Sequence, residues 1–211
     1  MHDGGDAAAL AALGATDARL ADLLDRVGRP PPFRRAATLR SLALVVLEQQ
    51  LSLDAAAAHL AALEEALAGP PTPALLAGLD ADTARAAGVS RQKHRTLVEL
   101  GRAALDGRLD IDGLADLDDA AARAALLDLH GIGPWTADVV LLAMLGRADV
   151  WPVGDRALQV AAHEELGLVG VPGPAELERV AAPWRPHRSA AARLLWHAYL
   201  LRRGRTAPVV A

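Results

Sequence analysis

The sequence predicts an all-α protein, and three observations carry that prediction. Hydrophobic residues make up 52% of the 211 residues, and alanine, the strongest helix former, is very frequent. Apolar residues recur at helical spacing behind capping residues. No segment alternates apolar and polar residues as a half-buried strand does. We therefore expect about a dozen helices joined by short loops.

The expected helices have recognisable starts and stops. In chain order they cover 6–13, 18–27, 38–50, 53–68, two short segments behind Thr72 and Asp80, 91–105, 120–129, 134–145, 156–166, 174–182 and 187–203. The residues expected to cap helix N-termini are Asp17, Ser52, Thr72, Asp80, Ser90 and Asp118. Glycine- and proline-rich breaks at 28–32 and 167–174 divide the helices into two lobes.

The composition excludes several classes of protein. The chain has no cysteine, which rules out disulfides, thiolate zinc sites and a cysteine-ligated iron–sulfur cluster. None of the seven histidines has metal-site spacing. The N-terminal segment is polar and acidic, unlike a secretory leader, and the longest apolar run, 139–145, is too short to cross a bilayer. We expect a cytoplasmic protein with no membrane partner.

The net charge of −4 requires that any nucleic-acid binding use local basic patches. The candidate clusters are Arg34-Arg35, Arg91/Lys93/Arg95, Arg185/Arg188 and Arg202/Arg203/Arg205. Each cluster can equally be an ordinary solvated helix face.

The rest of the chain is organised around a short turn, Gly131-Ile132-Gly133, between two helices. Pro134 suits the first position of the second helix, because its missing N–H would be unpaired there. The two glycines allow a tight hairpin pressed against something outside, with Gly133 expected at a positive φ. Helix N-termini bind anions, so this turn is either an anion site or a plain helix–helix connection.

The run from Gly131 through Pro134 and Trp135 to Ala137, with Asp155 following 24 positions after Gly131, resembles the helix-hairpin-helix (HhH-GPD) DNA glycosylases. The most similar branch is the alkyladenine (3-methyladenine) DNA glycosylase II family. The resemblance covers roughly 38–203. His130 departs from the proline that is common before the first glycine.

The resemblance implies a single two-lobed unit over residues 1–211. Both chain ends, roughly 1–33 and 168–211, would form one lobe. Residues 34–167, with the hairpin at 120–145, would form the other. A ligand pocket is expected in a cleft between the lobes.

Asp155 is the candidate catalytic residue. The resemblance places the essential aspartate at this helix N-terminus, where an aspartate can also be an ordinary N-cap. A carboxylate suits the reaction, because breaking an N-glycosidic bond develops positive charge on the sugar. An alkylated purine already carries positive charge, so no dedicated general acid is required. Asp138, the nearest other carboxylate, can instead pack the hairpin.

The resemblance also implies a base pocket. Trp135 and Trp196 fall on lining positions, where a tryptophan face attracts an electron-poor alkylated base. Val139 and Arg156 replace aromatic residues of the family, which implies a wider pocket or a different mode of recognition. Core packing is the alternative for each tryptophan, and it suits Trp151 and Trp184 better.

The expected DNA contacts come from three segments. Gln50 would fill the gap left by a flipped base, with Leu51 and Ser52 in the minor groove; alternatively, this segment is a polar turn. Gly131, Ile132, Gly133 and Thr136 would contact a phosphate, and Arg188 the DNA backbone. In the family the hairpin carbonyls hold Na⁺ or K⁺, which here implies the backbone of Leu129 and Gly131. No other cofactor is expected.

The function implied is a monofunctional DNA glycosylase that removes 3-methyladenine- and 7-methylguanine-type purines in base-excision repair. Its partner would be duplex DNA with an alkylated base, bound by a monomer that is nucleoid-associated if bacterial. Bifunctional relatives carry a lysine where this chain has Trp135, and Lys93 is its only lysine. The alternatives are a non-catalytic helix-hairpin-helix DNA-binding protein and a glycosylase for deaminated or oxidised bases.

Overall fold

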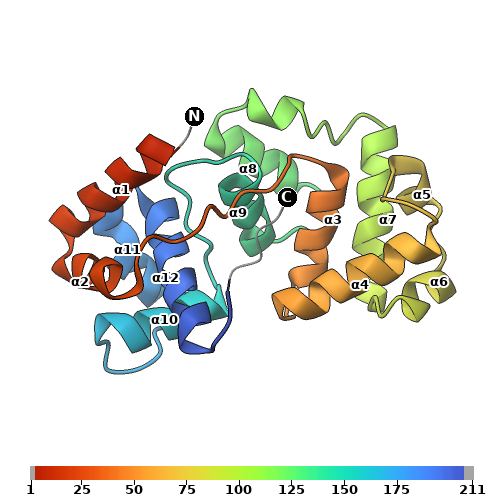
Figure 1. The fold of residues 1–211 in the computed structure, drawn as a ribbon. Helices are drawn as coiled ribbons and strands as arrows, with labels where there is room; N and C mark the ends of the chain where they lie inside the picture. The colour runs from red at the N-terminus through yellow and green to blue at the C-terminus, as the bar shows by residue number, and fades with distance from the viewer. Residues whose placement is uncertain (1–2, 207–211) are drawn as a thin grey trace. The chain divides into compact units, whose positions relative to one another are not determined.

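A computed structural model describes residues 3–206, which form twelve α-helices, two short 3-10 helices and no strand. The all-α prediction is therefore confirmed (Figure 1). The α-helices are α1 (Asp3–Thr16), α2 (Ala18–Val27), α3 (Leu39–Glu48), α4 (Leu53–Ala66), α5 (Pro73–Ala77), α6 (Ala81–Ala86), α7 (Arg91–Leu105), α8 (Asp119–Leu127), α9 (Pro134–Ala143), α10 (Arg156–Leu166), α11 (Pro174–Ala181) and α12 (Arg188–Arg202). The 3-10 helices are η1 (Gly113–Ala115) and η2 (Ala182–Trp184). No helix among the described residues is long and apolar enough to cross a membrane.

The chain divides into two compact units. The terminal unit comprises residues 1–34 and 146–211, and the central unit comprises 35–145. The first boundary lies beside the proline-rich break at 28–32. The second boundary differs from the expected one near 167, because α10 packs against α12 and α2 and so groups residues 146–167 with the chain ends.

The terminal unit is built by α1, α2, α10, α11 and α12, which pack on one another around small and aliphatic side chains (Figure 1). Trp151 and Trp184 lie in this core with their ring centroids 5.6 Å apart in an edge-on arrangement. The Trp184 indole N–H donates to Asp17 at the N-cap of α2, 3.1 Å away. Core packing is therefore the observed role of both tryptophans.

The central unit gathers around α3, whose residues from Ser41 to Glu48 are all buried. Helix α7 packs against α5, α3 and α6, and Figure 1 shows α7 beside α5. Gly101 permits this contact, because a Cβ there would lie 2.4 Å from the Ala77 amide nitrogen of α5. Helices α8 and α9 pack together as the arms of the hairpin.

Local sequence chemistry sets the helix ends. All six predicted capping residues accept a backbone N–H hydrogen bond at the start of their helices, as residues of these types prefer to do. The first helix is longer than expected and begins at Asp3 rather than near residue 6.

Candidate functional site

The hairpin of the central unit starts where α8 ends at Leu127 and finishes where Pro134 opens α9. Asp118 caps α8 by accepting from the Ala121 N–H at 2.8 Å. Within the turn the Ile132 N–H donates to the Leu129 carbonyl at 3.1 Å. The predicted helix–glycine turn–helix arrangement is thus present, with both helices slightly shorter than expected.

The two glycines of the turn have different roles. Gly131 has a φ of +86°, and a Cβ there would lie 1.8 Å from the Thr96 hydroxyl of α7. Gly131 is therefore required for the turn to approach α7, inside the protein. Gly133 has a φ of −94°, and a Cβ there would meet nothing within 4 Å. The expectation of a positive φ at Gly133 was wrong: this residue is the extended N-cap of α9.

The N-terminus of α9 leaves backbone donors available. Gly133 is the N-cap and supplies no side-chain acceptor. Across residues 3–206, no acceptor is hydrogen-bonded to the N–H groups of Gly131, Gly133 or Thr136. Unpaired N–H groups at the positive end of a helix dipole attract anions. This end of α9 can therefore bind a phosphate oxygen.

Gln49 fixes the hairpin from the end of α3. Its side-chain amide donates to the Gly131 carbonyl at 3.2 Å and to the Thr136 hydroxyl at 3.0 Å. The sequence predicted a role for Gln50 and none for Gln49. The only sequence signal for this contact was the Gln49-Gln50 pair at a helix end, and the pair does not indicate which of the two side-chain amides points into the protein.

The segment after Gln49 turns outward. Gln50 is exposed and has a φ of +58°, a left-handed conformation that costs a non-glycine residue about 1–3 kcal/mol. Leu51 is 39% exposed. Ser52 caps α4 by accepting from the Ala55 N–H at 3.3 Å. Gln50 and Leu51 are therefore presented to solvent, whereas the Ser52 hydroxyl is committed to its helix.

Asp155 opens α10 in the terminal unit. Gly154 precedes it with a φ of +82° and turns the chain into the helix. The Asp155 Oδ1 accepts from the Leu158 N–H at 2.8 Å and from the Trp196 Nε1–H at 3.2 Å. The residue is only 7% exposed. Asp155 is therefore the N-cap of α10, and these two hydrogen bonds hold its carboxylate in a defined orientation.

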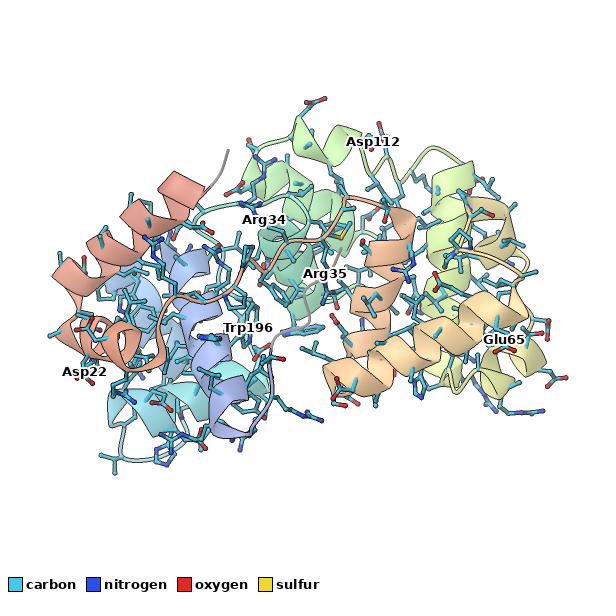
Figure 2. All side chains as sticks on the ribbon, in the orientation of Figure 1. Asp22, Arg34, Arg35, Glu65, Asp112 and Trp196 are labelled. Atoms are coloured by element: carbon cyan, nitrogen blue, oxygen red, sulfur yellow. The ribbon has the colours of Figure 1, made fainter. Side chains whose placement is uncertain are left out.

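Trp196, which Figure 2 labels, donates its indole N–H to that carboxylate. It projects from α12, and its ring centroid lies 5.2 Å from that of Phe33, with the ring planes tilted by 48°. Arg156 is exposed beside Asp155, with its guanidinium 3.4 Å from the Gln159 side-chain oxygen. The terminal unit thus brings Asp155, Trp196 and Arg156 to the start of α10.

The other two predicted pocket residues lie on α9 in the central unit, one helical turn apart. Trp135 is half-buried. Val139 is 2% exposed and lies in a stretch of α9 that is buried from Thr136 to Ala143. Asp138, in the same stretch, accepts from Arg123 of α8 at 2.7 Å. That ion pair joins the two helices, which is the hairpin-packing alternative for Asp138.

Two arginines of the expected basic surface clusters form ion pairs with carboxylates of the protein. Arg188 donates from Nε and Nη2 to the Asp149 carboxylate at 2.7 and 2.9 Å, and its side chain is 11% exposed. Arg35 is buried and paired with Glu48. The assignment of Arg188 to DNA is therefore not supported by its geometry. Arg185, whose side chain is 62% exposed, is the more available residue of that cluster.

The hairpin carbonyls expected to hold a monovalent cation each accept one hydrogen bond within the protein and keep a second lone pair. The Gly131 carbonyl accepts from the Gln49 amide. The Leu129 carbonyl already accepts from the Ile132 N–H. No group of three or more histidine, aspartate or glutamate side chains suited to a metal occurs in the described part of the chain.

These features define an all-helical protein whose two helices α8 and α9 are joined by a glycine hairpin, that is, a helix-hairpin-helix protein. A family model described as "HhH-GPD superfamily base excision DNA repair protein" matches residues 43–186. The chain belongs to this superfamily.

Curated relatives agree with that membership. The Mycobacterium tuberculosis "Probable bifunctional transcriptional activator/DNA repair enzyme AlkA" is 34% identical over 193 residues, which cover 83% of this chain and 37% of that protein. The Escherichia coli "DNA-3-methyladenine glycosylase 2" is 31% identical over 127 residues, 60% of this chain and 42% of that protein. The chain thus spans less than half the length of these curated relatives.

Solved structures share the fold over nearly their whole length. The Schizosaccharomyces pombe 3-methyladenine DNA glycosylase Mag1, in complex with abasic DNA, superimposes with a TM-score of 0.83 at 26% identity, covering 89% of this chain and 94% of that one. The Bacillus halodurans DNA-3-methyladenine glycosidase gives a TM-score of 0.73 at 30% identity, covering 91% and 89%.

Proposed function

We propose that the protein is a monofunctional DNA glycosylase that hydrolyses the N-glycosidic bond of alkylated purines, of the 3-methyladenine and 7-methylguanine type, in base-excision repair. The observation that carries the proposal is the Asp155 carboxylate, which Leu158 and Trp196 hold at the N-terminus of α10. The names of the similar proteins support the choice of substrate class.

Asp155 stabilises the positive charge that develops on the sugar. The C1′–N bond breaks, the base leaves with the electron pair, and the sugar becomes oxocarbenium-like. A fixed carboxylate lowers the energy of that cation. Water then adds to C1′ and loses a proton. Because a cationic alkylated purine leaves as a neutral base, the reaction needs no second carboxylate, in keeping with the pairing of Asp138 to Arg123.

The hairpin binds the DNA backbone in this proposal. The unpaired N–H groups of Gly133 and Thr136 suit a phosphate oxygen, and such contacts position the protein without reading sequence. The partner is a duplex that carries an alkylated base, and the protein acts on it as a monomer.

Gln50 takes the place of the flipped base. Glycosylases rotate their target out of the stack, and the gap has to be filled. The exposed left-handed Gln50 next to the exposed Leu51 suits that role, while Trp196 offers an aromatic face beside Asp155. Stacking on a tryptophan face attracts a cationic base more than a neutral one.

The enzyme stops after base removal. Strand cleavage requires an amine that attacks the sugar and forms a Schiff base. Trp135 stands at the position of the lysine in bifunctional relatives, and the Lys93 amine donates to the Leu47 carbonyl at 2.7 Å. Burial lowers the pKa of Lys93, but this hydrogen bond holds its amine at the end of α3. Borohydride added during turnover should therefore trap no protein–DNA adduct.

The test is to incubate the protein with methylated duplex DNA and identify the released bases by chromatography. Release of 3-methyladenine or 7-methylguanine, leaving abasic sites on intact strands, is the expected result. If bases were released only from DNA that carries deaminated or oxidised bases, those lesions would be the substrate class in place of alkylated purines. If the protein bound DNA but released no base, it would be a non-catalytic DNA-binding protein.

A further inference from the structure

We propose that three arginines on one face of α7, Arg91, Arg95 and Arg102, form a phosphate-binding stripe that holds duplex DNA outside the lesion site. The proposal rests on the proposed function for the identity of its partner, since it assigns duplex DNA as the ligand. The stripe would add a second contact with DNA to the one proposed at the hairpin and would bind damaged and undamaged duplex alike.

The first observation is a census of the cations in the central unit. This unit has nine lysines and arginines. Five of the arginines pair with carboxylates, and Lys93 donates to the Leu47 carbonyl. The remaining three, Arg91, Arg95 and Arg102, are exposed, and their side chains have no partner in the described chain. Every unpaired cation of the unit therefore lies on a single helix.

The second observation is their spacing. Positions 91, 95 and 102 fall within about 40° of one another around an α-helix and extend over roughly 16 Å of its axis. The opposite side of α7 is occupied: Gly101 meets α5, Thr96 meets Gly131, and Lys93 meets the end of α3. The stripe thus faces away from the core.

The third observation is that nearby acids offset the charge of the stripe only in part. Glu99 lies one turn after Arg95, and Asp106 one turn after Arg102. Arg108 donates to Glu99 at 2.9 Å and lies 3.6 Å from Asp106, so these three groups keep one net negative charge, against three positive charges in the stripe. Arginines that are held apart from carboxylates remain available for phosphate oxygens, which the guanidinium fork matches well.

The fourth observation is that the proposed DNA-binding hairpin packs against the same helix, α7, inside the same unit. Thr96, next to Arg95, is the residue that the Gly131 backbone approaches. Gln49 joins the same turn to the end of α3, and Lys93 joins α7 to that helix end. The stripe and the hairpin turn therefore lie on different sides of the same helix, α7, within one unit. The stripe would give an acidic chain a local basic surface for DNA, because five of the unit's 15 acidic residues lie in the separate segment 110–119.

The experiment measures the salt dependence of binding to undamaged duplex for Arg91→Gln/Arg95→Gln and for the triple variant with Arg102→Gln. The slope of log affinity against log salt should become shallower by about 1.8 and 2.7, at about 0.9 for each lost phosphate contact. Base release at saturating enzyme should stay at the wild-type rate. The triple Arg→Lys variant should keep the wild-type slope.

The matched control is Arg29→Gln/Arg179→Gln, which removes two exposed, unpaired arginines from the terminal unit. Slopes that change no more in the stripe variants than in this control would overturn the proposal. A second result would also overturn the proposal: the stripe variants lose a self-associated species in sedimentation while the salt slope of their DNA affinity stays unchanged. The stripe would then bind an acidic segment of a second copy and not DNA. If wild-type protein released no base while the slope shifts persisted, the glycosylase proposal would fail and the stripe would stand.

Discussion

The N-termini of α9 and α10 resemble each other in backbone and differ in electrostatics. Both follow a glycine with positive φ, at Gly131 and Gly154. Helix α9 has Gly133 as its N-cap and leaves backbone N–H groups without acceptors in the described chain. Helix α10 has Asp155 in the same place, so the protein supplies the anion itself. One helix end can therefore bind an external phosphate, whereas the other already holds a fixed carboxylate.

The difference depends on one side chain at the capping position. A helix N-terminus carries about half a positive charge, which an anion from any source can balance. When the anion is a fixed aspartate, the same geometry that stabilises the helix also orients the carboxylate, as the proposed catalytic role requires. Capping and catalysis are therefore compatible roles for Asp155 rather than alternatives.

Replacing Asp155 with Asn should have the largest effect. The substitution keeps the shape and the oxygen that accepts from Leu158 and Trp196, but removes the charge. Single-turnover release of alkylated base should fall by ~10²–10³, the usual contribution of an electrostatic group in a site. The thermal midpoint should change little.

Asp17→Asn is the matched control for that change. Asp17 is also an N-cap that accepts an indole N–H, and the hydrogen bond from Arg19 lowers its pKa to about 2. Because the pKa of Asp17 is lower in the folded protein than in the unfolded chain, its ionised carboxylate stabilises the fold above about pH 4. This stabilisation is lost as the pH falls toward 2. This variant should lose stability at neutral pH and keep its rate of base release. Equal losses of activity in both variants would reduce Asp155 to a structural cap.

Gly133→Asp should weaken DNA binding at α9. The new carboxylate would occupy the position of the phosphate, so duplex affinity should fall roughly tenfold or more, with a salt slope shallower by about 0.9. Gly133→Asn tests the same side-chain size without the charge, and the open space and φ of −94° at this position tolerate both. Identical affinities and slopes for wild type and both variants would mean that α9 does not face DNA.

Trp196→Phe should slow base release by about tenfold. It keeps an apolar ring near Phe33 but removes the indole N–H that donates to Asp155, and one hydrogen bond of about 1.4 kcal/mol corresponds to that factor. The loss should appear in the rate at saturating enzyme, with duplex affinity unchanged. A loss confined to affinity would make Trp196 a binding residue only.

Gln49→Met should have the smallest effect on the affinity for duplex DNA. The variant keeps the side-chain length but removes the hydrogen bonds to Gly131 and Thr136, so the free energy of unfolding should fall by about 1–2 kcal/mol. Duplex affinity should fall by a few-fold as the turn loosens, with no change in the charge-dependent slope. Urea denaturation and binding titrations provide both values. Wild-type stability would show that Gln49 does not fix the hairpin.

The sequence predicted what depends on local chemistry. Helix positions, the six capping residues and the glycine turn all follow from propensities that act within a few residues. The burial of Arg35 against Glu48, the pairing of Arg188 with Asp149 and the inward turn of Gln49 depend on partners 13, 39 and 82 positions away. No pattern along the chain specifies such contacts, and the unit boundary at residue 145 has the same origin in long-range packing.

The opposite electrostatics of the two helix ends can be tested with one binding measurement on intact protein. A duplex that carries a protonated pyrrolidine in place of the target sugar mimics the cation of the transition state, and a neutral abasic analogue does not. Wild-type protein should bind the cationic duplex far more tightly than the neutral one. Asp155→Asn should abolish that preference, whereas Gly133→Asp should weaken both duplexes and preserve their ratio. An unchanged preference in Asp155→Asn would contradict the role assigned to the carboxylate at α10.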